Sequence, residues 1–234
     1  MFVPLVVATA AVAASLSLAA APGAVAGDGQ SYRAHWSLNE VGSPVAADSS
    51  GNGNDGTNYN VVGDGTGYTF NGANSRVIVP TSAILNPGAA NFSWGVTLSM
   101  TRPPSPLGET YDVLRKGLVT TKGGDYKLEV KNVNGKALAR CVAKSFRQDG
   151  TKVLASIRGT TTLADSRRHV VTCTKTSTTI TLKVDSLTPR TKTFLGGLGS
   201  VSNTSNLALG AKAESTTSTG FDWFEGVIFD AWVA

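Results

Sequence analysis

The sequence has little cysteine, little histidine and almost no helical periodicity, and each shortage excludes a class of protein. Its 234 residues include 2 cysteines and 2 histidines, and the cysteines lack CxxC spacing, so there is no zinc signature. Glycine, threonine, serine, asparagine and β-branched residues recur too often for a long apolar stripe of helical period. We therefore expect neither a zinc protein nor a helical protein.

Motifs of hydrolytic enzymes are also missing. There is no Gly-x-Ser-x-Gly elbow, and neither His35 nor His169 has a sequence partner that suggests nucleophilic catalysis, so both are interpreted as structural. Glycoside hydrolases need two carboxylates about 5 Å or about 6.5–9.5 Å apart. The pairs Asp222 with Glu225 and Glu225 with Asp230 have odd spacings, which place the partners on opposite faces of a regular strand unless a bulge intervenes. We predict no catalytic site.

The only long apolar run lies at the start of the chain. Residues 1–26 carry no charge and end in Ala24-Val25-Ala26, a pattern typical of a secretory signal with cleavage before Gly27. The run lacks Lys or Arg near its start and is long enough to span a bilayer, so an uncleaved anchor remains an alternative. We expect a secreted protein with one domain, residues 27–234, and no membrane span after signal cleavage.

The charged residues indicate a mildly basic protein. All 21 Lys and Arg and all 16 Asp and Glu follow residue 26, giving a net charge of +5. Such a charge favours anionic partners such as wall polymers or acidic glycans. The basic residues are scattered and form no run, so nucleic acid is not an expected partner.

Cys141 and Cys173 are predicted to form a disulfide, because an exported chain with two cysteines usually oxidises them. Each cysteine lies on a strand-like segment, and Cys141 shares its face with the small residues Ala137, Ala139 and Ala143. Closing a loop of about 30 residues stabilises a fold by about 3–4 kcal/mol on the chain-entropy model.

Strand patterns are abundant. Apolar residues alternate with other residues in the segments 32–38 and 92–100, which predicts strands with one buried face. Further strands are expected at 76–79, 113–116, 126–131, 136–144, 152–157, 168–175, 179–185, 191–194, 207–210 and 225–233. Turns at 132–135 and 176–178 predict two hairpins. The chain is therefore expected to be all-β, a two-sheet antiparallel jelly-roll sandwich, with an immunoglobulin-type sandwich less favoured at this length.

The segment 48–56, DSSGNGNDG, has the start of a calcium loop. Asp48, Ser50 and Asn52 stand at positions one, three and five with Gly53 at six, but Tyr59 replaces the closing glutamate of an EF-hand. A glycine-rich turn without any ion gives the same pattern. Both interpretations stay open.

Several fragments together resemble the concanavalin A-like superfamily, in particular the laminin-G-like jelly rolls of secreted bacterial proteins. In order, they are HWSLNE, AADSSGNGNDGT, FNGANSRVIVP, NFSWGVTLSM, RHVVTCTKTSTTITLKVDS and FEGVIFDAWV. The resemblance implies a non-catalytic binding module for an extracellular glycan or an anionic surface polymer. An extracellular structural or protein-interaction domain is the alternative, and a glycoside hydrolase-like enzyme a distant one.

The resemblance also implies a structural calcium, because relatives combine the early loop with an acid late in the chain. Here the ligands would be Asp48, Ser50 and Asn52, with Asp55 or Asp230 completing the oxygen shell. The family's closing strand usually carries two acids, whereas Phe229 occupies the first of these positions in this chain. That departure weakens the expected site.

Three aromatic residues are candidates for stacking on a sugar ring. Tyr59, Tyr111 and Trp223, like Phe146, stand in neighbourhoods rich in Gly, Asp or Ser that are typical of loops and strand ends. An aromatic side chain in such a place either stacks on a ligand or anchors the loop. The sequence does not place them relative to one another.

Overall fold

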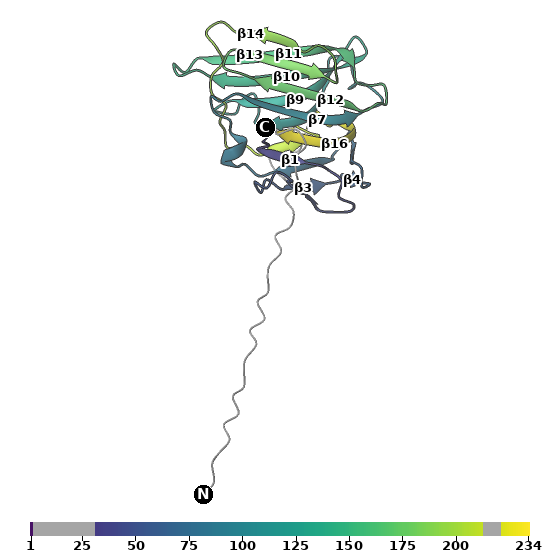
Figure 1. Cartoon of the computed structure of the whole chain (residues 1–234). Coiled ribbons are helices and arrows are strands. Elements are labelled where there is room, and N and C mark those ends of the chain that lie inside the picture. Colours follow the sequence, from purple (N-terminus) through teal and green to yellow (C-terminus); the bar gives the residue numbers. More distant parts are fainter. Residues whose placement is uncertain (2–30, 213–220) are drawn as a thin grey trace.

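The computed structural model describes Met1 and residues 31–212 and 221–234, which fold into two packed antiparallel sheets (Figure 1). Apart from Met1, the predicted signal segment lies outside the described residues, and so does Gly27. The sheets confirm the prediction of an all-β jelly-roll sandwich. The one helix in the described part is the short 3-10 helix η1 (Ala83–Leu85), so no helix there has the length needed to cross a bilayer.

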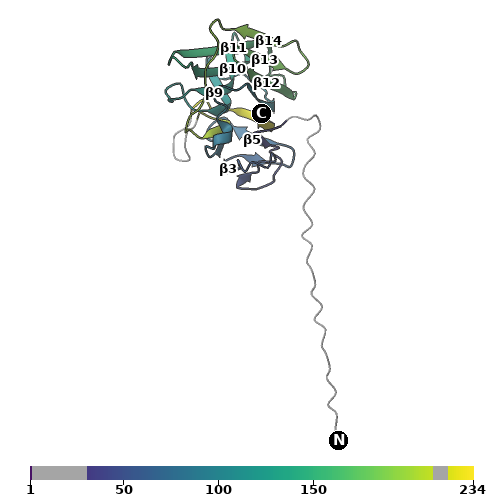
Figure 2. The same ribbon diagram turned by 60° about the vertical axis from the view of Figure 1, so that its left-hand side comes forward.

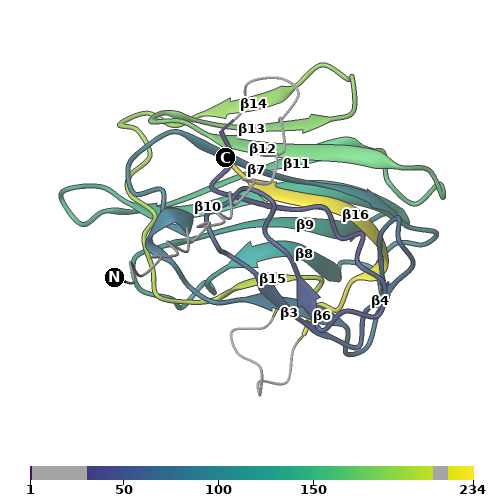
Figure 3. The ribbon, with the colours of Figure 1, turned by 60° about the horizontal axis from the view of Figure 1, so that its bottom comes forward.

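Each sheet has eight strands among the described residues. Sheet A runs in the order β14 (Arg190–Thr193), β13 (Thr179–Val184), β12 (His169–Lys175), β7 (Phe92–Ser99), β16 (Glu225–Val233), β5 (Tyr68–Asn71) and β4 (Val62–Gly63), with β1 (Ala34–Trp36) also paired to β16. Sheet B runs in the order β11 (Lys152–Thr162), β10 (Lys136–Phe146), β9 (Asp125–Val133), β8 (Thr110–Lys116), β15 (Leu207–Leu209), β6 (Arg76–Val79), β3 (Gly56–Tyr59) and β2 (Val45–Ala46). In Figure 3 the strands β9, β8, β15, β6 and β3 follow one another across sheet B.

The inner faces of the sheets enclose one apolar core. The alternation predicted for β7 is confirmed, since Trp94, Val96 and Leu98 are fully buried there. Trp36 is also fully buried, and its indole nitrogen donates to the Asn54 carbonyl at 2.8 Å, which ties β1 to the loop before β3. Burial of such side chains is the main force that holds the two sheets together.

The predicted disulfide is confirmed, and it links the two sheets. Cys141 on β10 is bonded to Cys173 on β12, with 5.6 Å between the Cα atoms and no exposed surface on either residue. The neighbours Ala137, Ala139 and Ala143 leave room for the bridge, as the sequence indicates. The bond therefore joins sheet B to sheet A inside the core.

Both predicted hairpins are present. Residues 176–178 connect β12 to β13, and β9 turns into β10 through Asn134 and Gly135. These two residues have φ angles of 53° and 78°, as a type I′ turn requires, and an Asn-Gly pair suits those angles.

Four strands were not predicted, namely β2, β3, β4 and β5. They have two to four residues each, which is too short for a periodic signal, and β3, β4 and β5 also contain glycine or asparagine, which are depleted in strands. The first predicted strand is shorter than expected, because Leu38 has a φ angle of 48° that ends the extended backbone. Gly56 in β3 is needed for packing, since a Cβ atom there would lie 2.4 Å from a Val77 methyl group.

Candidate functional site

The outer face of sheet B carries two of the predicted aromatic residues and a series of buried ion pairs. One register row crosses seven strands, and its side chains point away from the core. The row is Thr57, Ile78, Ala208, Arg115, Lys127, Val142 and Ser156. At about 4.8 Å between neighbouring strands, this row is about 29 Å long. It therefore forms a surface long enough for an extended polymer.

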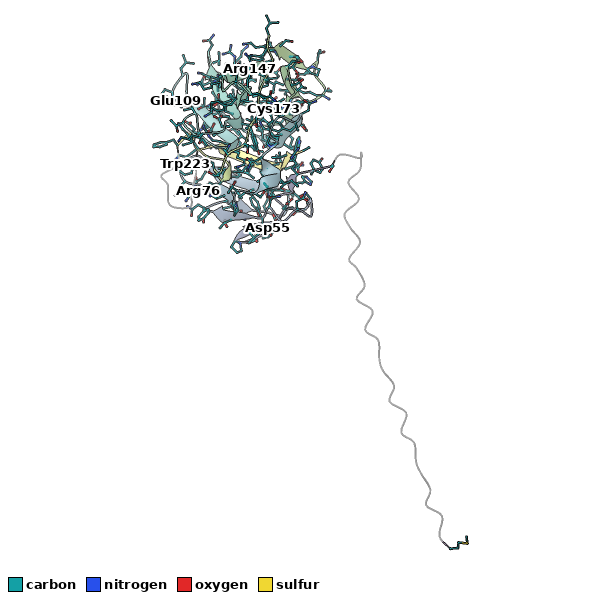
Figure 4. The ribbon with its side chains drawn as sticks, turned by 90° about the vertical axis from the view of Figure 1, so that its left-hand side faces the viewer. Asp55, Arg76, Glu109, Arg147, Cys173 and Trp223 are labelled. Carbon is teal, nitrogen blue, oxygen red and sulfur yellow. A yellow bond between two sulfur atoms is a disulfide. The ribbon has the colours of Figure 1, made fainter. Side chains whose placement is uncertain are left out.

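An aromatic platform lies at the β3–β6 end of this face. The Arg76 guanidinium carbon lies 4.5 Å from the Tyr59 ring centre and 5.9 Å from the Trp223 ring centre. Tyr59 and Trp223 pack on a small outer cluster that includes the buried residues Ile78 and Ala208. Figure 4 shows Arg76 and Trp223 next to each other on the same side of the molecule. The structure thus brings together two of the three predicted aromatic residues.

We define the aromatic platform as Tyr59, Arg76 and Trp223. Both aromatic residues are only partly exposed and pack on the outer cluster, so their rings are held in place while part of each side chain stays accessible. Exposed Phe221 stands close by along the chain, with the Lys212 ammonium 5.9 Å from its ring centre. Preorganised aromatic surface of this kind loses little conformational entropy when a ligand stacks on it.

A ladder of buried ion pairs occupies the middle of the same face. Asp112 accepts from Arg115 and from Lys127, and Lys127 also contacts Glu129, which accepts from Arg140 at 2.9 Å. Asp112 and Glu129 are 0% and 1% exposed. Because charges this deeply buried are costly unless paired, the ladder fixes the positions of β8, β9 and β10 relative to one another.

Tyr111 does not belong to the platform. It is 9% exposed, and its ring packs edge-on against Phe224 with 5.9 Å between the centres. Phe146 stands elsewhere, in a hollow of 690 Å³ at the far end of β10 that Arg147 and Leu198 also line. Figure 4 shows Arg147 at the opposite end of the molecule from Asp55.

The Asp48 loop is held together by hydrogen bonds. One carboxylate oxygen of Asp48 accepts from the backbone N–H groups of His35 and Ser50, each at 2.9 Å. The other accepts from the backbone and side-chain nitrogens of Asn54, at 2.8 and 3.2 Å. Burial opposes ionisation of Asp48, but these donors outweigh it, so the pKa of Asp48 lies below its usual value.

This arrangement does not fit a calcium ion held by the five predicted ligands. Both Asp48 oxygens face N–H donors, Asp55 accepts from the Asp48 backbone, and the Asn52 amide donates to two backbone carbonyls. Asp230 points to His35 instead. The described residues also contain no cluster of three His, Cys, Asp or Glu side chains suited to a metal. Calcium stays a prediction from the sequence, and we assign it no role.

His35 is at the centre of a hydrogen-bonded line from Asp230 to Ser49. Its Nε2 lies 2.6 Å from Asp230 and its Nδ1 lies 2.8 Å from the Ser49 hydroxyl. The hydrogen bond with Asp230 raises the pKa of His35, although burial opposes the rise. When the ring is protonated it donates to both partners, and Ser49 then accepts from His35 Nδ1 while its hydroxyl donates to the His35 carbonyl at 3.0 Å. This polarity is opposite to that of a general base, and the group fastens β1 to β16 and to the Asp48 loop.

The raised pKa of His35 predicts a pH-dependent contribution to stability. It is complete below the unfolded pKa of about 6.5 and disappears as the pH rises through the folded pKa. We expect the melting temperature of the chain to exceed that of His35→Gln most at pH 5–6, and the difference to shrink towards pH 9. Melting curves of both proteins across this range test the point, and a difference that is constant or grows with pH contradicts it.

The late acids also find separate partners. A bulge between Ile228 and Asp230 places Glu225 and Asp230 on the outer face of sheet A. Glu225 forms an ion pair with Arg102 at 2.6 Å. Along β16, Glu225 and Asp230 are four strand positions apart once the bulge is allowed for, a distance of about 13 Å. This is more than the separation that glycosidase carboxylates have. His169 is interpreted as structural as well, since it lies between Asp165 at 2.9 Å and Asp185 at 2.8 Å.

Comparison with solved structures supports the fold. The binding domain of Paraclostridial Mosquitocidal Protein 1 is similar with a TM-score of 0.60 and 17% identity over 86% of this chain and 48% of that one. The botulinum neurotoxin serotype D binding domain is similar with a TM-score of 0.56 and 12% identity, over 87% of this chain and 48% of that one. Trypanosoma rangeli sialidase in complex with sialic acid is similar with a TM-score of 0.54 and 16% identity, over 86% of this chain and 30% of that one.

These likenesses define a class of fold, the two-sheet antiparallel β sandwich, and at such low identity nothing narrower. The chain spans about half the length of the two binding domains. No protein-family model matches the chain, and no curated protein matches it. Function must therefore be argued from the chain's own surface.

Proposed function

We propose that this chain is a secreted, non-catalytic module that binds carbohydrate through the outer face of sheet B. The narrower assignment to laminin-G-like domains is part of the proposal, and the order of the sequence fragments supports it. Secretion is supported by the apolar segment 1–26 and by the buried disulfide, since such bonds persist in oxidising compartments.

The aromatic platform is the observation that carries the proposal. Two aromatic rings from distant parts of the chain meet around one arginine on an outward face. Sugar rings present apolar C–H faces and hydroxyl groups, which match an aromatic surface beside a fixed cation and its N–H donors. Similar solved folds include two proteins described as binding domains and one solved with sialic acid, which agrees with a ligand of this kind.

The test is a binding screen of residues 27–234 against immobilised polysaccharides, repeated with Trp223→Ala and Tyr59→Ala. We expect saturable binding to one class of polymer and about a 10-fold or larger loss of affinity in each variant, because stacking contacts of an aromatic ring at this level are worth about 1–3 kcal/mol. Phe229→Ala is the matched control. Phe229 is also a partly exposed ring under an arginine, with Arg168 3.7 Å from its centre, but it lies on sheet A.

Two results would contradict the proposal. One is the absence of saturable binding to any polysaccharide, which would leave a protein-interaction domain as the better account. The other is binding that survives both platform variants but is lost in Phe146→Ala, which would move the site to the hollow at the end of β10.

A further inference from the structure

A cationic groove lies at the other end of the same face. It has a volume of 510 Å³, within the range of small-ligand sites. Four basic residues line it together with Ser156, Ile157, Gly159 and Thr160, and none of its lining residues is acidic. The four are Lys131, Arg140, Arg158 and Arg190. Arg190 comes from β14 of sheet A, which packs beside β11 at this end of the sandwich (Figure 2).

Two arginines stand directly opposite each other in this groove. Arg140 on β10 and Arg158 on β11 are cross-strand partners in the register. Like charges in this position destabilise a sheet unless something neutralises them. Glu129 neutralises Arg140, but no carboxylate among the described residues lies within 4.0 Å of Arg158, Lys131 or Arg190.

The ion-pair ladder explains why this end of the face is positive. Across sheet B the charges alternate from Arg115 through Asp112, Lys127 and Glu129 to Arg140. At the next strand the alternation stops, because Arg158 follows Arg140 where an acid would continue the pattern. The surplus positive charge is therefore concentrated at the groove and left for a ligand to neutralise.

We infer that the groove binds the acidic groups of an anionic polysaccharide, so that the module takes a polyanionic glycan. The inference rests on the proposed carbohydrate-binding function and names the ligand class. Guanidinium groups match the planar, two-oxygen geometry of carboxylate and the oxygens of sulfate, and three of the four basic groups are arginines.

The groove and the aromatic platform can bind two parts of the same polysaccharide molecule. Register pairs link Tyr59 to Arg76 at the platform, and Glu129 to Arg140 and Arg140 to Arg158 at the groove, all on one face. A polymer lying across the strands would stack one sugar on the platform and place acids about 19–29 Å away in the groove, the span of four to six strand spacings. Nucleic acid is less favoured, because no exposed aromatic ring stands among the four basic residues that line the groove.

Matched polymers test the inference. Binding of residues 27–234 is measured by calorimetry to polygalacturonate and to its fully methyl-esterified form, and to dextran sulfate and unmodified dextran. The two pairs separate carboxylate from sulfate recognition. The variant Arg158→Gln/Arg190→Gln is compared with Lys122→Gln/Lys152→Gln, which loses the same charge at exposed positions outside the groove lining.

We expect a charged polymer to bind more tightly than its neutral partner, and the arginine variant to lose about 10- to 100-fold in affinity for it. Affinity should fall with added salt, less steeply in that variant. The control variant should retain its affinity. The melting temperature of Arg158→Gln should be unchanged or higher, because a like-charge contact is relieved.

Equal affinity for charged and neutral polymers overturns the inference that the groove binds acidic groups, while leaving the carbohydrate-binding proposal intact. Equal losses in the arginine and control variants overturn it too, because the effect would then be one of net charge. A 20-nucleotide single-stranded DNA that binds more tightly than both charged polymers would overturn it in favour of nucleic acid. Loss in the arginine variant but not in Trp223→Ala would support the groove and contradict the platform.

Discussion

Replacing both cysteines, as Cys141→Ala/Cys173→Ala, is expected to lower the free energy of unfolding by about 3–4 kcal/mol. The bond closes a loop with a sequence separation of 32 and joins β10 to β12 across the core. On the chain-entropy model, removing the bond raises the conformational entropy of the unfolded chain, which lowers the free energy of unfolding by this amount. For a domain of this size the loss corresponds to a melting temperature lower by about 6–16 °C.

Denaturant unfolding of the oxidised chain, the reduced chain and the double variant measures this effect. The reduced chain should resemble the variant, and the variant should not respond to reductant. A double variant within about 1 kcal/mol of the oxidised chain would show that the apolar core alone holds the sheets together and that the bond adds little.

Replacing Asp112 with Ala is expected to cost about 3–5 kcal/mol of stability, because it leaves two cations without their shared carboxylate in a buried place. Asp112 is 0% exposed, Arg115 is 3% exposed, and the Lys127 side chain is 16% exposed. Arg115 would keep its bond to the Gly117 carbonyl at 2.7 Å, and Lys127 would keep Glu129. Neither contact replaces the charge that is lost.

The double variant Asp112→Leu/Arg115→Met is the control for this prediction. Removing both members of a buried pair takes away the uncompensated charge, so stability should recover relative to Asp112→Ala. Urea unfolding of the three proteins gives the comparison. If Asp112→Ala unfolds like the parent, the ladder does not hold β8 and β9 together.

The sequence predicted the fold well because the large strands carry a strong local pattern. The alternation in β7 and the Asn134-Gly135 turn can each be recognised from neighbouring residues alone. The short strands β2 to β5 could not be predicted in this way. They are strands because of the partners they pair with: β3 pairs with β6, and β5 pairs with the distant β16. The two-residue strands β2 and β4 then pair with β3 and β5.

The candidate site was predicted only in part, for the same physical reason. Sequence context indicated that Tyr59 and Trp223 stand in loops or at strand ends, but not that Arg76 would bring them together. Tyr111 has a similar context and packs inside. The pairing of Arg140 with Arg158 depends on the register of β10 and β11, which a list of scattered basic residues does not reveal.

The Asp48 loop shows the opposite case, in which a motif is visible but its role depends on hydrogen bonds. Its spacing resembles the start of a calcium loop, yet the oxygens of Asp48 are directed at N–H groups of His35, Ser50 and Asn54. Because those donors come from β1 and from the loop itself, the turn needs no ion to be stable. Melting temperatures with 2 mM calcium and with chelator should therefore agree, and a clear rise with calcium would contradict this interpretation.

The central claim is that the outer face of sheet B is the carbohydrate-binding surface. Hydroxyl-radical footprinting of residues 27–234, with and without polygalacturonate, tests it most directly, because oxidation reports the accessibility of individual aromatic side chains. The account predicts that Tyr59 and Trp223 become protected on binding while Phe229 on sheet A and Phe146 at the end of β10 do not change. Protection of Phe229 or Phe146 with none at Tyr59 and Trp223, or no protection anywhere, would contradict it.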